Sequence, residues 1–340
     1  MTNRQVSLKD IAAELKISIS TVSRALKNHP DISPALTSKI QELARQWNYS
    51  PNPLAMGLLR QQTKTIGVIV PDLVTYFYSS IISGIEHVAK ENGYYIIIAS
   101  SHESYEKEIE CIDNLLMSRV EGLIVCLAQG TKDYAHFDKI IQNEIPLVFF
   151  DRVCRTNEVS VVTTDNRDAA RQITVHLYEG GARHIAHIAG PQHLNIARER
   201  LEGYRLGLRD CGFSAKDEMV EYTNLNPEDA AKAATRLLAL PDRPDAIFGV
   251  NDYVTFGVLK AIRNNGLRIP DDVSLVGFTD EFHATIVDPP LTSVIHPTFE
   301  IGEEAARLFL RQCKQSEKPP IARVVLKNNL VVRGSSIKPV

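Results

Sequence analysis

Apolar positions in the first fifty residues recur at the spacing of amphipathic helices. Ser7 with Asp10 forms a candidate capping pair for a first helix, and Ser18 is the N-cap candidate of a second. Ser33-Pro34 opens a third helix, because proline is favoured at the first helical position. The first two helices repeat their apolar residues at i, i+3 and i+4, at Leu8, Ile11, Ala12, Leu15, Val22, Ala25 and Leu26. Two short helices joined by a three-residue turn predict a helix-turn-helix, whose small core we expect Trp47 to fill.

From residue 65 onward, short apolar runs alternate with helical stretches. We predict strands at 66–70, 94–99, 122–126, 146–150, 159–164, 184–189, 246–250, 273–278 and 291–295. We predict helices at 79–92, 105–118, 168–178, 198–211, 227–240 and 252–265. This alternation is typical of parallel sheets, and so many strands favour two lobes over one sheet. Residues 324–333 predict a hairpin around Asn328-Asn329.

Composition limits the class of protein. A chain of 340 residues with 44% hydrophobic positions predicts two or more globular domains. No apolar run is long enough to span a membrane, and the polar N-terminus lacks a secretory pattern, so we expect a cytoplasmic protein without a membrane partner. The five cysteines are far apart and form no CxxC pair, which predicts neither a disulfide framework nor a zinc ribbon.

Charge is distributed unevenly along the chain. Residues 1–64 hold nine Lys and Arg against four Asp and Glu, a net charge of +5, whereas the remainder carries −8. A basic head on an acidic body suggests that the head meets a polyanion.

Enzyme motifs are missing from the sequence. The glycine spacings allow neither a GxGxxG fingerprint, a Walker A loop nor a GxSxG elbow, and no HExxH occurs. His184 and His187 are three apart in a predicted strand, so they point to opposite faces and do not suggest a metal site. We therefore expect no catalytic residue, no cofactor and no metal.

Several segments resemble the lactose-repressor/galactose-repressor (LacI/GalR) family of bacterial transcription regulators. They include SLKDIAAELKISISTVSRAL, NYSPNPLAMGLLR, HIAHIAGP, AIFGVNDYVTFGVLKAI and DPPLTSVIHP. The resemblance implies an all-α helix-turn-helix headpiece and an α/β periplasmic-binding-protein-like core of two parallel-sheet lobes. It implies a DNA-binding domain at 1–50, a hinge helix and linker at 51–64, and an effector-binding core at 65–340. The N-lobe would span about 65–163 and 295–323 and the C-lobe about 164–292 and 324–340, with crossovers near 163–166, 290–296 and 322–326.

The resemblance also assigns DNA contacts. Ile19, Ser20 and Arg24 match base-reading positions, and a guanidinium pairs well with guanine. Leu58 matches the leucine that wedges into the minor groove, with core packing as the alternative. The remaining positions are candidates either for phosphate contacts or for helix caps alone: Ser7, Ser18, Thr21 and Ser23.

Effector contacts are implied at the strand ends that face the cleft between the lobes. The matching positions are Tyr76, Phe77, Asp151, Arg200, Leu225, Asn251, Thr279 and Phe299. For the aromatic residues, core packing is the alternative. Thr279-Asp280 stands where the family often has Asp-Asp, and Leu194 and Ile196 are apolar where relatives can be polar. The ligand is then either less polar than a simple sugar, or the site is degenerate.

These features together predict a sequence-specific DNA-binding regulator, expected to be a repressor. Its partners would be a pseudo-palindromic DNA site, a sugar-related effector and a second copy of the chain, because one head covers only half a site. Ligand would act through a two-state switch, as an inducer or as a corepressor. Two alternatives are a stand-alone sugar-binding protein, which would lack the head, and an α/β enzyme, which would need a catalytic motif.

Overall fold

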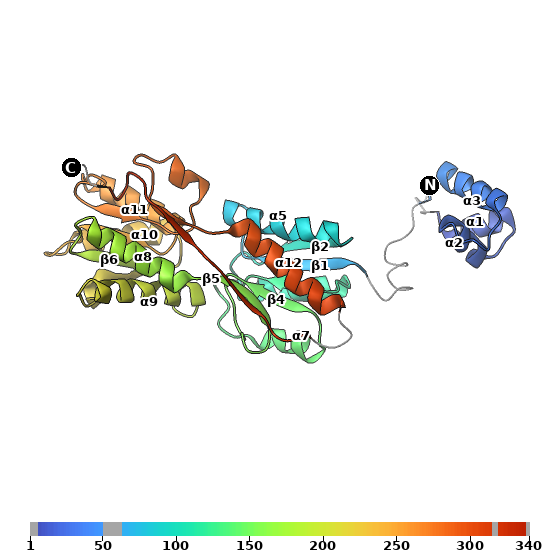
Figure 1. The fold of residues 1–340 in the computed structure, drawn as a ribbon, viewed down its shortest axis with the longest axis horizontal. Helices are drawn as coiled ribbons and strands as arrows, with labels where there is room; N and C mark the ends of the chain where they lie inside the picture. The colour runs from blue at the N-terminus through green and yellow to red at the C-terminus, as the bar shows by residue number, and fades with distance from the viewer. Residues whose placement is uncertain (1–5, 50–62, 315–318, 338–340) are drawn as a thin grey trace. The chain divides into compact units, whose positions relative to one another are not determined.

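The computed structural model describes residues 6–49, 63–314 and 319–337. The chain divides into two compact units, Met1–Thr63 and Lys64–Val340. We call them the head and the core and describe each by itself (Figure 1).

The head consists of three helices, α1 (Leu8–Leu15), α2 (Ile19–Leu26) and α3 (Pro34–Gln46). Ser7 and Asp10 form a capping box on α1, and Ser18 and Ser33 cap α2 and α3, as predicted. The fully buried residues are contributed by all three helices: Ile11, Val22, Ala25 and Ile40. Trp47, at the end of α3, is partly buried and packs against this core, so it covers the edge of the core and does not fill its centre. Small aliphatic side chains already close the space between such short helices.

The N-lobe of the core is built on a six-stranded parallel sheet with the order β11-β5-β4-β3-β1-β2. Its strands are β1 (Thr65–Val70), β2 (Tyr95–Ser100), β3 (Gly122–Val125), β4 (Leu147–Phe150), β5 (Ser160–Thr164) and β11 (Arg323–Leu326). Helices α5 (Tyr76–Glu91) and α12 (Thr298–Lys314) cover one face, and α6 (Tyr105–Met117) and α7 (Asp138–Gln142) cover the other. The strands read as continuous apolar runs because helices bury both faces of the sheet.

The C-lobe repeats this arrangement on a smaller sheet with the order β7-β6-β8-β9. Its strands are β6 (Ile185–Ala189), β7 (Val220–Tyr222), β8 (Ala246–Gly249) and β9 (Ser274–Val276). Helices α10 (Pro227–Leu238) and α11 (Asp252–Asn264) pack on one face, and α8 (Asn166–Glu179) and α9 (Asn195–Asp210) on the other. An antiparallel pair, β10 (Ser293–Ile295) with β12 (Asn329–Val331), completes the lobe.

The last two strands correct one prediction. Residues 324–333 do not form a hairpin, because β11 pairs in parallel with β5 whereas β12 pairs with β10. Asn328 instead lies in the crossover between the lobes, where its backbone N–H donates to Asp165 Oδ1 at 2.8 Å. Residues 324–326 therefore belong to the N-lobe sheet, and the third crossover follows the predicted range. Helix α12 and strand β7 were not among the predicted elements.

Two expectations from composition can be compared with the structure. All five cysteines are free thiols. Within the described parts of the chain, no helix combines the length and apolar character needed to cross a membrane.

Candidate functional site

The start of α2 presents a hydroxyl-rich surface in the head. The Ser18 hydroxyl accepts the Thr21 backbone N–H at 3.0 Å and lies 2.7 Å from Ser20 Oγ and 2.8 Å from Thr21 Oγ1. Ile19 is 48% exposed although it is a large aliphatic residue. The N-terminal turn of α2 therefore offers both polar and apolar groups at one exposed end, as a helix that contacts base edges in a major groove requires.

Arg24 lies further along α2, and its side chain is also exposed. Its guanidinium is 3.9 Å from the Asp31 carboxylate, and both side chains are more than half exposed. Such a surface pair contributes little, so the guanidinium remains available to a partner. Ser7 takes part in the capping box, with its hydroxyl 2.6 Å from Asp10 Oδ2, so at least its capping role is present. Leu58 lies outside the described residues.

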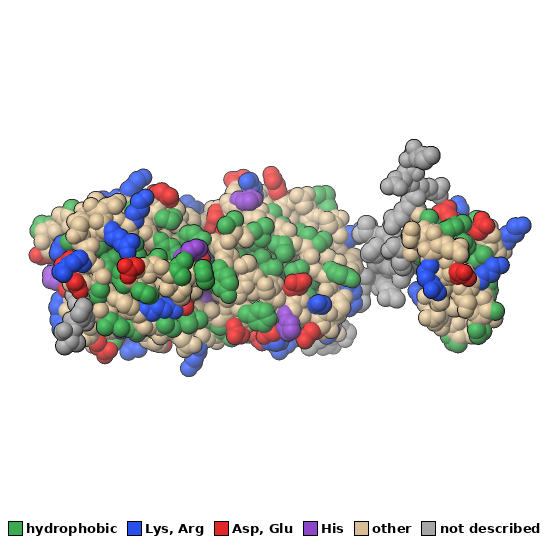
Figure 2. All heavy atoms as spheres, turned by 90° about the horizontal axis from the view of Figure 1, so that it is seen from above, with side chains coloured by type: hydrophobic (Ala, Val, Ile, Leu, Met, Phe, Trp, Pro, Cys, Tyr) green, Lys and Arg blue, Asp and Glu red, His purple; other side chains and the backbone are tan. Residues whose placement is uncertain are grey.

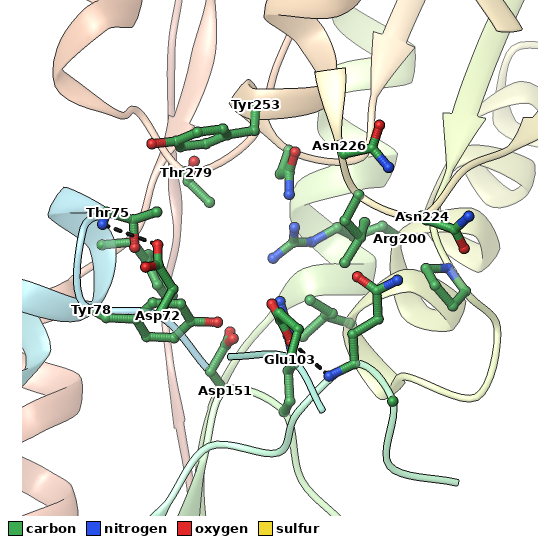
Figure 3. A pocket seen from close by; sticks show the side chains of 18 of the residues that line it. Asp72, Thr75, Tyr78, Glu103, Asp151, Arg200, Asn224, Asn226, Tyr253 and Thr279 are labelled. Carbon is green, nitrogen blue, oxygen red and sulfur yellow. Dashed lines mark hydrogen bonds and ion pairs between the residues drawn. The ribbon is translucent and has the colours of Figure 1, made fainter. Parts of the chain in front are cut away.

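A cavity of about 700 Å³ lies between the two lobes of the core and is called the cleft below. Six of the eight predicted effector positions line it: Phe77, Asp151, Arg200, Leu225, Asn251 and Thr279. Figure 3 shows Asp151 and Glu103 on one side of the cavity facing Arg200 and Asn224 on the other. These residues come from loops after the carboxyl ends of the strands and from the helix starts that follow them, where parallel sheets hold their ligands.

Arg200 is the central cation of the cleft. Only 1% of the residue is exposed, and its guanidinium donates to Asn166 Oδ1 at 3.0 Å and to the Val250 carbonyl at 2.7 Å. It also stacks on the Phe278 ring, with Cζ 3.8 Å from the ring centre. Burial lowers the Arg200 pKa to about 10, against the opposing effect of Asp151, so the side chain stays charged at neutral pH. The protein thus holds a rigid, charged donor at the cleft.

Asp151 faces this cation from the N-lobe. It directly follows β4 in a left-handed backbone conformation with φ +56°, and it lines the cleft. The Cys126 thiol is 3.9 Å from its Oδ2 and also 3.9 Å from the Tyr78 hydroxyl. Burial raises the pKa of Asp151, while Arg200 and Arg152 counteract the rise. A ligand hydroxyl that donates to this carboxylate would replace hydration that burial has removed.

The cleft combines this charged pair with amides and with apolar surface. Asn251 caps α11 through its Oδ1, which accepts the Val254 N–H at 2.8 Å, so its side-chain amide nitrogen remains a donor. Phe77, Ile196 and Leu225 supply apolar surface. Buried carboxylate, guanidinium and amide groups beside apolar surface suit a small molecule with several hydroxyls and at least one apolar face.

The structure does not bring Tyr76 and Phe299 to the cleft. Tyr76 is the first residue of α5 and is 58% exposed, because successive helical residues diverge by about 100° and Phe77 takes the inward position. Phe299 lies on α12, is 39% exposed and packs beside His87, with the ring centres 5.8 Å apart. The expectation that Phe299 forms the cleft floor is therefore wrong.

Other residues of the cleft were missed by sequence reasoning. They are Asp72, Thr75, Tyr78, Glu103, Gln129, Gly130, Lys132, Arg152, Pro191, His193, Asn224, Asn226, Tyr253 and Glu281, besides Ile196, which the sequence marked only as a departure. Glu103 and Arg152 form an ion pair at 2.7 Å, so two of the missed charges neutralise each other. Several of these residues follow closely after a strand, as Asp72 follows β1, and this position was the sequence feature that could have identified them. Asn224 and Asn226 had no such signal, because β7 was not predicted.

The lobes are joined by hydrogen bonds along one side of the cleft. The Asn195 side chain, on α9, donates to the Asp151 carbonyl and accepts the Val153 N–H, both at 3.0 Å. His193 Nε2 lies 2.7 Å from the Gln129 carbonyl. Side chains of the C-lobe are thus hydrogen-bonded to the backbone of the N-lobe. A change in the angle between the lobes must break or re-form these hydrogen bonds.

Several apolar residues of the core are exposed. Strand β2 is an edge of its sheet, and Tyr95 and Ile97 on it are 77% and 41% exposed. Val74, in the loop before α5, is 89% exposed, and Phe282, in the segment after β9, is 60% exposed. Figure 2, which shows the core from the side that carries α5, has hydrophobic side chains spread over the middle of this face. Exposed apolar patches of this kind mark interaction surfaces.

Comparison with known proteins agrees with both units. The model of bacterial regulatory proteins of the lacI family matches residues 7–52, and that of the periplasmic binding protein-like domain matches residues 174–336. The chain is 33% identical over 333 residues to the HTH-type transcriptional repressor CytR of Escherichia coli K12, covering 97% of this chain and 96% of that protein. It is 31% identical to catabolite control protein A of Priestia megaterium, covering 90% and 92% of the two chains.

Solved structures give the same result. The lac repressor dimer bound to operator and the anti-inducer ONPF has a TM-score of 0.85 at 26% identity, covering 98% of this chain and all of that chain. The complex of the transcriptional regulator CelR with cellobiose has a TM-score of 0.74 at 30% identity, covering 97% of this chain and all of that one. This chain therefore belongs to the lacI family of bacterial regulatory proteins.

Proposed function

We propose that the chain is a sequence-specific transcriptional repressor whose DNA affinity is set by a small, sugar-related molecule in the cleft. The observation that carries this is the presence in one chain of an exposed, hydroxyl-rich α2 and a separate buried cleft. The names of its relatives agree, since CytR is a transcriptional repressor and CelR was solved with cellobiose.

In the head, we propose that Ile19, Ser20 and Arg24 contact bases, while Ser7, Ser18, Thr21 and Ser23 contact phosphates or cap helices. Leu58 is proposed as the minor-groove wedge in the hinge, residues 51–64. Two heads are needed for a two-fold site, so we propose a homodimer that uses the exposed apolar residues of β2, α5 and the loop after β9. Since the proposed target is DNA, we propose that the protein acts in the cytoplasm.

In the cleft, we propose that Asp151 accepts ligand hydroxyls and that Arg200, Asn251 and Thr279 contact ligand oxygens. Asp280 is not available for this role, because its carboxylate holds the Arg333 guanidinium at 2.5 and 3.0 Å. Thr279 and the apolar Phe77, Ile196 and Leu225 favour a ligand with fewer hydroxyl contacts than a free hexose. A sugar derivative with an apolar substituent fits this cleft better than a simple sugar.

A ligand screen tests the effector site. Full-length protein is heated with members of a panel of sugars, glycosides and nucleosides, because a ligand that binds the folded state raises the unfolding temperature. A hit must lose its effect with Asp151→Asn and keep it with Asp133→Asn, a change outside the cleft. A ligand whose binding is indifferent to Asp151 would refute the proposed site.

A further inference from the structure

A second cavity, of about 740 Å³, lies where the lobes join and is called the hinge groove. It is formed by the loop after β4, strands β5 and β11, and the first turns of α8 and α9, which meet near the middle of the core in Figure 1. Its charged lining residues are Arg155, Arg167, Arg171, Arg198, Arg323, Asp165, Asp168 and Glu199. Five guanidinium groups and three carboxylates line the groove, and carboxylates outside the lining pair with three of the arginines.

Three of these arginines are engaged by carboxylates. Arg155 pairs with Asp138 at 2.7 Å, Arg167 with Glu202 at 2.5 Å, and Arg171 with Asp210 and, at 3.6 Å, with Asp168. The other two carboxylates of the lining have donors of their own. Asp165 accepts the Asn328 N–H at 2.8 Å, and Glu199 accepts the Asn166 amide at 3.1 Å.

Arg198 and Arg323 differ from the other three. Neither has a carboxylate within ion-pair distance among the described residues, and Arg323 donates only to the neutral groups of Thr156 and Asn157. Arg198 belongs to α9 of the C-lobe, whereas Arg323 belongs to β11 of the N-lobe. The two free cations therefore line one groove from opposite lobes.

The groove also contains hydrogen-bond donors other than the arginine side chains. Helix α9, of 16 residues, begins there without a hydrogen bond from an N-cap side chain, whereas the start of α8 already carries the carboxylates of Asp165 and Asp168. Open helix N-termini attract anions through their backbone N–H groups and the helix dipole. In addition, Arg155 Nε is buried and has no hydrogen-bond partner within the described structure.

The groove and the cleft share structural parts. Asp151 lines the cleft, and the residues that follow it in the same loop, 153–156, line the groove. Asn195 lines the groove and holds this loop through the Asp151 carbonyl and the Val153 N–H. A ligand in the groove would thus act on the loop that positions Asp151.

We propose that the hinge groove is a second ligand site, which binds the phosphate group of a small molecule between Arg198 and Arg323. Arg198 and Arg323 supply two guanidinium groups without a carboxylate partner among the described residues, and such groups are the preferred planar donors to a phosphate dianion. Bound there, the anion bridges the two lobes and stabilises one lobe angle. It therefore modulates the response to the cleft ligand.

Calorimetric titration of the full-length protein at constant ionic strength tests the proposal. The probes are inorganic phosphate and, as a simple monoester, glycerol 3-phosphate; tighter binding of the ester identifies an organic ligand. The double variant Arg198→Gln/Arg323→Gln is expected to weaken binding at least about tenfold, since each lost hydrogen bond involves two charged groups. The matched control is Arg209→Gln, which removes an exposed arginine of the same helix outside the groove and should leave binding unchanged.

Three results would overturn the proposal. The first is no binding of either probe to the parent protein. The second is equal binding by the parent and the double variant. The third is loss of binding with Lys132→Gln instead, since Lys132 lines the cleft and the anion would then belong there. Circular dichroism of each variant confirms that the fold is intact. None of these results depends on the identity of the cleft ligand, so the proposed function is tested separately.

Discussion

His187 is a buried histidine whose protonation must oppose folding. It lies on β6, fully buried, between the rings of Phe248 and Tyr204, with ring centres 4.4 and 5.3 Å away. Its Nδ1 is 2.9 Å from the Phe248 carbonyl and therefore carries the proton, while Nε2 is buried without a hydrogen-bond partner among the described residues. Burial lowers the His187 pKa from 6.5 to about 3, although the Phe248 carbonyl favours the charged form.

The sign and size of the effect follow from linkage. Because the pKa is depressed in the folded state, the stability contributed by neutral His187 is complete above pH 6.5 and is lost as the pH falls toward 3. Unfolded chains take up the proton first, at about 1.4 kcal/mol per pH unit. Between pH 7 and pH 4.5 this single group should lower the free energy of unfolding by about 2.5 kcal/mol.

The perturbation is His187→Asn, which keeps a donor for the Phe248 carbonyl but removes the titrating ring. Urea unfolding is followed at both pH values by circular dichroism, which reports mainly the core, whereas fluorescence of Trp47 reports the head. We expect the variant to be less stable at pH 7, because ring packing is lost, but to lose about 2.5 kcal/mol less on acidification. His184→Asn, at an exposed histidine just before β6, is the control. If both variants keep the parent's acid sensitivity, the argument about His187 fails.

Three further changes test the proposed sites. Arg24→Ala should cost about 1–3 kcal/mol of affinity for the selected DNA site and relax the base preference at one base pair. Arg24→Lys should restore the salt dependence of binding but not this base preference. If the Arg24→Ala protein keeps its full specificity in a binding-site selection, the assignment of Arg24 is contradicted. Asp151→Asn should weaken binding of the cleft ligand about tenfold. The variant should not lose stability, because burial already raises the Asp151 pKa. Calorimetry measures the affinity and thermal unfolding measures the stability, and an affinity equal to that of the parent protein would contradict the proposed role. Ile97→Lys should shift the protein toward monomers in sedimentation, whereas Met117→Lys, at an exposed methionine outside the proposed interface, should not; an unchanged dimer would exclude β2 from the interface.

The fold was largely predictable because two features of the sequence are strong signals: the helix caps of the head and the apolar runs of the strands. Helix starts in the head are set by local hydrogen bonds, as at Ser7 and Ser18, which depend on neighbouring residues only. The parallel strands carry continuous apolar runs because both faces of each sheet are buried. Asn328 shows the limit, since local pattern does not distinguish a hairpin from a crossover whose strands join different sheets.

The cleft was predictable only in part. Asp151 and Asn251 were found because they end strands that the apolar runs identified. Tyr76 and Phe77 carry the same residue-type signal, but the start of α5 decides which ring points inward. Phe299 failed because its helix, α12, was not recognised and packs outside the cleft against α5. Positions in the cleft depend on how two lobes meet, which no local pattern encodes.

Selection of bound sequences from a random DNA pool by the full-length protein tests the central claim most directly. The account predicts one enriched palindrome, with half-sites about one helical turn apart and a central step that deforms easily. It also predicts that Arg24→Ala protein enriches a more degenerate site under the same conditions. Repeating the selection with the ligand that stabilises the cleft should change the yield of this palindrome and not its sequence. Failure to enrich any sequence, with and without that ligand, would contradict the assignment of the head as a DNA reader.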